Sequence, residues 1–220
     1  MLDCWMFDPN ESPYKRSGGF SYMRFSRREI YEIGVSVVVL TLAFAIVFSQ
    51  WFPAIYETTL ENFIAWLMIC AVVVLTGFVL HELGHKFAAQ AYGAWAEYRM
   101  YPKGLALALL VAFLGFIFAA PGAVYIQGII SKKQNGIISV AGPAVNLVVG
   151  ILALTAAWAF AGGMVAFVLL MLARVNLILA LFNLIPFPPL DGSKVLAWNP
   201  IVYFLVAGFA LLMFLATFNA

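Results

Sequence analysis

Six runs of apolar residues divide this chain, and each is close to the length that an α-helix needs to cross a membrane. About 20 helical residues span the hydrocarbon core of a bilayer. Hydrophobic residues make up 65% of the 220 residues, which exceeds what a soluble domain uses to build its core. We therefore predict an all-α polytopic membrane protein with five to six transmembrane helices. The apolar runs cover residues 33–52, 63–88, 104–120, 137–161, 164–186 and 200–218.

The N-terminal end differs from the rest of the chain in polarity. Residues 1–29 are predicted to form a flexible polar tail, because they combine charged residues with proline, glycine, serine and asparagine. Residues 30–220 are predicted to form a single intramembrane domain. The formal net charge is only +2, which argues against a nucleic-acid partner. This composition predicts that the chain lies in the lipid bilayer.

Loop charges indicate that the third apolar run does not cross the membrane. Basic residues collect in cytoplasmic loops, and the third run would separate two basic pairs if it crossed. Pro121 and Gly122 interrupt the helix just after this run. We therefore predict a re-entrant element over residues 104–130, which enters the membrane and returns to the same side. The two basic pairs are Arg99 with Lys103 and Lys132 with Lys133.

The chain's only two histidines lie in the second apolar run, four residues apart. On a helix, His81 and His85 share one face about 6 Å apart, so both can bind one ion. Glu82 completes the H-E-x-x-H pattern, in which two histidines hold zinc and the glutamate is the general base. The alternative is a pair of structural, hydrogen-bonded histidines. Ionisable groups within a membrane are functional in most cases, which favours the zinc interpretation.

A catalytic zinc ion needs a third protein ligand and one open position for water. Asp191 is the candidate, because it follows an apolar run that three prolines interrupt, in the stretch FNLIPFPPLDGSK. An Asp-Gly turn at the membrane surface is the alternative role for this residue. Zinc proteases that cut outside the bilayer use a downstream glutamate instead, and no glutamate follows Glu97. The sequence thus predicts one Zn²⁺ per chain.

Three motifs in order resemble the site-2 protease family of intramembrane zinc metalloproteases. They are HELGH at 81–85 followed by Tyr92-Gly93, AGPAVN at 141–146, and FNLIPFPPLDG at 182–192. The resemblance implies that His81, His85 and Asp191 bind the zinc ion and that Glu82 is the catalytic base.

The resemblance also implies roles for residues outside the ligand set. Asn183 is implied to lie near the metal, where it could stabilise the reacting carbonyl oxygen. Asn146 and the Gly142-Pro143 turn are implied to support the packing of the core. A short extended strand, Gly122 to Ile126, is implied to receive the substrate. The apolar stretch 104–118 ahead of this strand departs from the family pattern.

The function expected from these residues is an intramembrane zinc endopeptidase. It would hydrolyse peptide bonds within or near a transmembrane segment of a substrate protein, and residues 30–220 would be its metalloprotease domain. The alternative is a non-proteolytic membrane scaffold or a metal-transport protein with a zinc site. We expect a multi-pass protein of the cell membrane with its active site towards the cytoplasmic side.

Overall fold

The computed structural model describes residues 24–51, 59–117, 120–160 and 162–219. Within these residues the chain is almost entirely helical, and its two strands form one small sheet. The elements in chain order are α1 (Arg27–Trp51), α2 (Leu60–Val74), the π-helical turn η1 (Leu75–Val79), α3 (Leu80–Ala91), β1 (Trp95–Met100), α4 (Pro102–Ala112), β2 (Gly122–Gln127), α5 (Lys132–Ala159), α6 (Gly163–Asn183), α7 (Asp191–Trp198), α8 (Pro200–Ala216) and the 3-10 turn η2 (Thr217–Asn219).

Five helices in the described part of the chain are long and apolar enough to cross a membrane, which confirms a polytopic all-α protein. Among the described residues the third apolar run does not form a sixth span, in agreement with the prediction that it does not cross, because α4 has 11 residues and reaches about 16 Å, half the thickness of the hydrocarbon core. The five long helices cover Arg27–Trp51, Leu60–Ala91, Lys132–Ala159, Gly163–Asn183 and Pro200–Asn219.

The first helix begins inside the predicted polar tail. Helix α1 starts at Arg27, so residues 27–29 form its first turn. Glu29 is fully buried there, although its charge suggested a solvated tail. A carboxylate avoids burial unless it has partners, and those partners come from other elements of the fold. Residues 1–23 lie outside the described residues.

The re-entrant element is confirmed, and a two-stranded antiparallel sheet closes it. Met100 pairs with Gly122 across the sheet, so the chain returns to the point from which it left. The Tyr101 N–H donates a hydrogen bond to the Pro121 carbonyl at 2.7 Å. A Cβ atom at Gly104 would lie 2.1 Å from the Ala120 carbonyl oxygen, so the outgoing and returning segments touch at that glycine. The predicted strand at 122–126 is β2, whereas β1 was predicted as loop.

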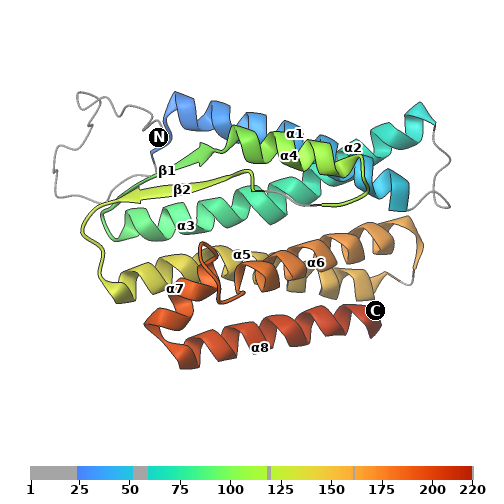
Figure 1. The fold of residues 1–220 in the computed structure, drawn as a ribbon. Helices are drawn as coiled ribbons and strands as arrows, with labels where there is room; N and C mark the ends of the chain where they lie inside the picture. The colour runs from blue at the N-terminus through green and yellow to red at the C-terminus, as the bar shows by residue number, and fades with distance from the viewer. Residues whose placement is uncertain (1–23, 52–58, 118–119, 161, 220) are drawn as a thin grey trace.

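The elements stack in two layers that meet at α3, the helix that carries the H-E-x-x-H residues (Figure 1). Helices α1, α2 and α4 pack together on one side, and α5, α6 and α8 form the other. The sheet lies beside α3, at the end of the molecule where α1 begins. Helix α3 packs against α5, and α7 packs against α5 as well. Helix α5 is therefore the common support against which α3 and α7 both pack.

Candidate metal centre

The two histidines lie on α3, directly after a π-helical turn. The turn Leu75–Val79 joins α2 to α3 without a break, so residues Leu60–Ala91 form one continuous helix. π-helical turns are rare and concentrate at functional sites. His81 and His85 follow it at helical spacing, and both are buried against α5. Helix periodicity alone places the two rings side by side, as the sequence predicted.

Asp191 reaches the histidines from a different part of the chain. Helix α6 ends at Asn183, and a non-helical segment containing three prolines leads to Asp191, the first residue of α7. Proline cannot continue a helix, so this segment separates α7 from α6 and lets α7 turn towards α5. The Asp191 side chain is buried and contacts Lys194 one turn further along the same helix, 3.4 Å away.

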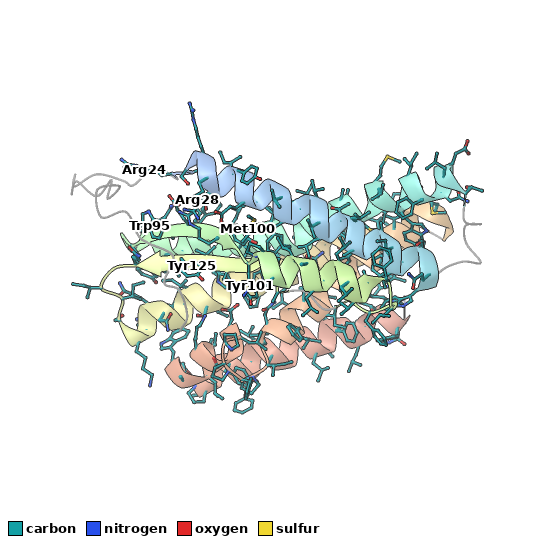
Figure 2. The ribbon with its side chains drawn as sticks, turned by 45° about the horizontal axis from the view of Figure 1, so that its top comes forward. Arg24, Arg28, Trp95, Met100, Tyr101 and Tyr125 are labelled. Atoms are coloured by element: carbon teal, nitrogen blue, oxygen red, sulfur yellow. The ribbon has the colours of Figure 1, made fainter. Side chains whose placement is uncertain are left out.

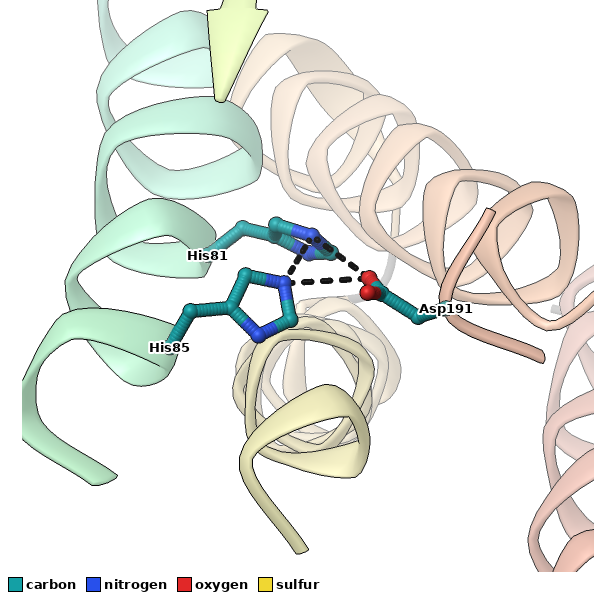
Figure 3. Close-up of side chains that lie close together, drawn as sticks. All are labelled: His81, His85 and Asp191. Atoms are coloured by element: carbon teal, nitrogen blue, oxygen red, sulfur yellow. Dashed lines mark hydrogen bonds and ion pairs between the residues drawn. The ribbon is translucent and has the colours of Figure 1, made fainter. Parts of the chain in front are cut away.

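Three side-chain atoms from α3 and α7 converge on one point (Figure 3). The two histidine Nε2 atoms lie 3.0 Å apart. One carboxylate oxygen of Asp191 lies 3.0 Å from Nε2 of His85 and 3.6 Å from Nε2 of His81. The structure therefore brings together all three predicted ligands, among which only the His81–His85 contact follows from local spacing.

Hydrogen bonds on the far side of each ring set the orientation of the lone pairs. The His85 Nδ1–H donates to the Ile138 carbonyl at 2.8 Å. The His81 Nδ1–H donates to the Asn146 side-chain oxygen at 2.5 Å. Asn146 accepts there because its amide nitrogen donates to the Gly77 carbonyl at 2.9 Å. In the neutral rings each Nε2 is consequently unprotonated and directs its lone pair towards Asp191.

This donor set fits a zinc ion. Two lone pairs and a carboxylate oxygen face one another at short range, an arrangement that a bound cation stabilises. Zinc–nitrogen and zinc–oxygen bonds of about 2.0–2.1 Å in a tetrahedron place ligand atoms about 3.3 Å apart. The three observed separations of 3.0, 3.0 and 3.6 Å lie around this value. His81, His85 and Asp191 would thus fill three positions and leave the fourth for water.

Gly142 of α5 provides the space in which the two rings lie. A Cβ atom at this position would be 2.4 Å from His85 Nε2 and 2.7 Å from His81 Nε2. We expect Gly142→Ala to push the rings apart and weaken zinc binding by about 10–100-fold, the range found when the groups that orient metal ligands are lost. Competition with a chelator on purified protein measures this change.

Gly150→Ala is the matched control for this substitution. Gly150 lies two turns further along α5, and a Cβ atom there would crowd Leu177 at 2.6 Å rather than the histidines. This variant should lower thermal stability through overpacking and leave zinc affinity unchanged. Equal zinc affinity in Gly142→Ala and the parent chain would show that Gly142 does not shape the metal site.

Glu82 connects the metal helix to the sheet. Its carboxylate accepts a hydrogen bond from the Val124 N–H of β2 at 3.0 Å. Glu82 itself is half-buried, between the two buried histidines in sequence. The predicted general base therefore lies at the edge of the strand that was predicted to receive the substrate.

Charge on Asp191 suits a metal ligand. Burial alone would raise the pKa of Asp191, but hydrogen bonds with His81 and His85 outweigh it and hold the pKa well below its usual range.

Asn183 donates from its side-chain nitrogen to the Leu179 carbonyl of its own helix at 3.0 Å. Its role near the metal stays a prediction.

Sequence reasoning missed the residues that orient the ligands. Asn146 was expected only to support packing, and the Ile138 carbonyl was not considered. Asn176 of α6 continues the network, because its side-chain oxygen accepts from Asn146 at 3.0 Å. A buried asparagine in an apolar helix was the available signal, since such a side chain requires hydrogen-bond partners. The identity of those partners depends on helix packing.

Curated proteins similar to this chain share one description. The protein named "Putative zinc metalloprotease MJ0611" of Methanocaldococcus jannaschii is 37% identical over 190 residues, which cover 84% of this chain and 92% of that protein. "Zinc metalloprotease MJ0392" of the same organism is 33% identical over 138 residues, 62% of this chain and 35% of the relative. "Putative zinc metalloprotease Rip2" of Mycolicibacterium smegmatis is 33% identical over 134 residues, 54% and 52% of the two chains. No family model and no solved structure matches the chain.

Proposed function

Because this chain belongs to the site-2 protease family of zinc metalloproteases, we propose that it is an intramembrane zinc endopeptidase. It hydrolyses peptide bonds within or near a transmembrane segment of a substrate protein. The observation that carries the proposal is the convergence of His81, His85 and Asp191 in a chain whose described residues include five helices long and apolar enough to cross a membrane. Zinc bound there would acidify water and polarise a peptide carbonyl.

Glu82 supplies the proton transfer in this proposal. Its carboxylate follows His81 on α3 and is held by the Val124 N–H. A carboxylate in this position accepts a proton from the attacking water and later delivers it to the amine of the departing peptide. Asn183 is proposed to stabilise the negative charge that develops on the carbonyl oxygen.

The outer edge of β2 is proposed to hold the substrate in an extended form. A transmembrane helix conceals its carbonyls in its own hydrogen bonds, so cleavage requires local unwinding. Backbone groups of an exposed strand edge can pair with the unwound segment. The Val124 N–H points to this edge and donates a hydrogen bond to Glu82. A peptide bound along β2 would therefore pass close to this base.

Transport and scaffold functions are less well supported by the arrangement. A transporter places ionisable groups along several spans to form a path. Among the described residues, one cluster of histidine and carboxylate ligands is found, and it is His81, His85 and Asp191. The two segments that supply it, α3 and α7, meet at a single cluster, which fits a reaction centre.

Mapping the cleaved bond tests the proposed function. Purified protein incubated with transmembrane substrates in liposomes should release products whose new termini lie inside the apolar segment, as identified by mass spectrometry. The zinc chelator 1,10-phenanthroline should stop the reaction, and added zinc should restore it. Products cut only in the soluble loops would contradict intramembrane cleavage.

The active site is proposed to face the cytoplasm. Lys103 lies in the first turn of α4, next to the Met100–Gly122 end of the sheet, and Lys133 lies in the first turn of α5, which follows the Trp95–Gln127 end. Both lysines are exposed, and loop charge predicts both on the cytoplasmic side. Cysteine introduced at either position, in a chain lacking Cys4 and Cys70, should react with an impermeant maleimide from the cytoplasmic side of vesicles. Labelling of the two from opposite sides would contradict the re-entrant element. Labelling of both from the outer side would contradict only the orientation.

A further inference from the structure

A buried ion pair on α3 has no part in the proposed chemistry. Lys86 directly follows His85, and its ammonium group contacts the carboxylate of Glu29 on α1. Both residues are fully buried. Two charges removed from water cost free energy, and a buried ion pair seldom repays that cost better than apolar residues of similar size. Stability alone is therefore a weak reason for this pair.

Glu29 also binds the backbone of the sheet. Its second carboxylate oxygen accepts the Tyr98 N–H of β1 at 2.9 Å. Glu32, one turn further along α1, accepts the Met100 N–H at 2.9 Å. Residues two apart on a strand direct their N–H groups to the same edge. The two carboxylates thus occupy the outer edge of β1 in the place where a third strand would pair. Figure 2 labels Arg28 of α1 and Trp95 and Met100 of β1 at the end of the molecule where α1 packs against β1.

The opposite edge of the sheet, on β2, is hydrogen-bonded to Glu82 of α3. Tyr98 pairs with Val124 across the sheet. Since the Tyr98 N–H points away from β2, the Val124 N–H points away from β1, and Glu82 accepts it. Glu82 and Lys86 are four residues apart on α3 and so share a face of that helix. Contacts therefore lead from Lys86 to Glu29 and on to Tyr98, and from Val124, the register partner of Tyr98, back to Glu82 on the helix that carries Lys86.

The same strand residue anchors the returning end of the re-entrant element. The Tyr98 hydroxyl donates to the Pro121 carbonyl at 2.8 Å, directly before β2 begins. It also lies 2.9 Å from the Ser36 hydroxyl of α1. Tyr98 and Ser36 are both buried. Helix α1 thus holds β1 along its edge and, through Tyr98, the entry into β2.

We propose that Glu29 and Glu32 are positioning residues for the substrate-binding sheet. Their carboxylates accept the outward N–H groups of Tyr98 and Met100 and so close the β1 edge as a substitute for a third strand, while Lys86 neutralises the buried charge of Glu29. At the β2 edge Glu82 occupies the Val124 N–H, and the other outward-facing backbone groups of β2 are left to pair with the substrate beside this base. This inference rests on the proposed proteolytic function and assigns to α1 the control of which peptide bond is placed at the metal.

Paired substitutions separate the strand-edge role from a general role of the ion pair. Lys86→Met with Glu29→Gln removes both charges and keeps a side-chain oxygen for the Tyr98 N–H. Lys86→Met with Glu29→Leu removes both charges and that oxygen. Glu32→Gln and Glu32→Leu repeat the comparison without a buried lysine, since the other partner of Glu32 is the exposed Arg28 at 2.7 Å. Arg28→Ala serves as the control for loss of that surface ion pair.

The measurements are zinc content, kcat and KM on a transmembrane substrate, the position of the cleaved bond by mass spectrometry, and amide hydrogen exchange of residues 95–100. All variants should keep one zinc per chain. The glutamine variants and Arg28→Ala should cleave at the parental bond. The leucine variants should lose about 100-fold in kcat/KM, the cost of a misplacement of about 1 Å. They should also cut neighbouring bonds and exchange their β1 amides faster.

The outcomes distinguish this inference from the function on which it rests. Leucine and glutamine variants that share one cleavage site, one kcat/KM and one exchange pattern would overturn the positioning role alone. Loss of zinc in the leucine variants at both positions 29 and 32 would also overturn it, since the carboxylates would then support the metal site as a whole. If the parent chain does not cleave the substrate, or cleaves it no faster than Glu82→Gln, the proposed function is overturned and this inference with it.

Discussion

The Glu82→Gln variant should bind zinc like the parent chain and cleave a transmembrane substrate roughly 1,000-fold more slowly, within the range that general acid–base catalysis contributes. The amide has nearly the same shape as the carboxylate, and its oxygen can still accept the Val124 N–H. The side chain therefore keeps its place while it loses the capacity to take a proton from water. Zinc content by mass spectrometry and initial rates on one substrate measure the two effects separately.

Glu61→Gln is the matched control for this prediction. Glu61 is exposed in the first turn of α2, about 30 Å from Glu82 along the same continuous helix. The Glu61→Gln variant should retain full activity and full zinc content. Cleavage by Glu82→Gln at the parental rate would exclude Glu82 as the base. Loss of zinc from Glu82→Gln would instead indicate that Glu82 supports the metal site directly.

Replacement of a ligand should empty the metal site. We expect His81→Ala, His85→Ala and Asp191→Ala each to lower zinc affinity by more than about 100-fold, beyond the effect of losing a group that only orients a ligand. Each variant leaves two protein ligands where catalytic zinc has three. Purified protein should fall from one zinc per chain to a small fraction after dialysis, as measured by elemental analysis.

Lys194→Met controls for the Asp191 substitution. Lys194 contacts the other carboxylate oxygen of Asp191 at 3.4 Å, and its side chain is partly exposed. Its removal should leave the zinc content intact, because an exposed ion pair contributes little. Full zinc in Asp191→Ala would refute Asp191 as the third ligand. Loss of zinc in Lys194→Met would show that the position of Asp191 depends on this contact.

Local periodicity carried the most accurate predictions. Five of the six apolar runs contain enough adjacent residues to specify a membrane-spanning helix, because a chain in lipid must satisfy its backbone polar groups within the same segment. The pairing of His81 with His85 likewise depends only on the geometry of one helix. The re-entrant element was predictable because loop charge limits which side each loop can occupy. Strand β1 was missed, since its pairing partner follows a long excursion of the chain.

The sequence by itself determined that this is a polytopic membrane protein with two histidines on one helix face and a glutamate between them. Only the tertiary structure decided that Asp191 completes the cluster, that Asn146 and the Ile138 carbonyl orient the rings, and that carboxylates of α1 close one edge of the sheet. The physical reason is the range of the interactions. Helix spacing is set by neighbouring residues, whereas these contacts join segments far apart in the chain and depend on how α3, α5 and α7 pack.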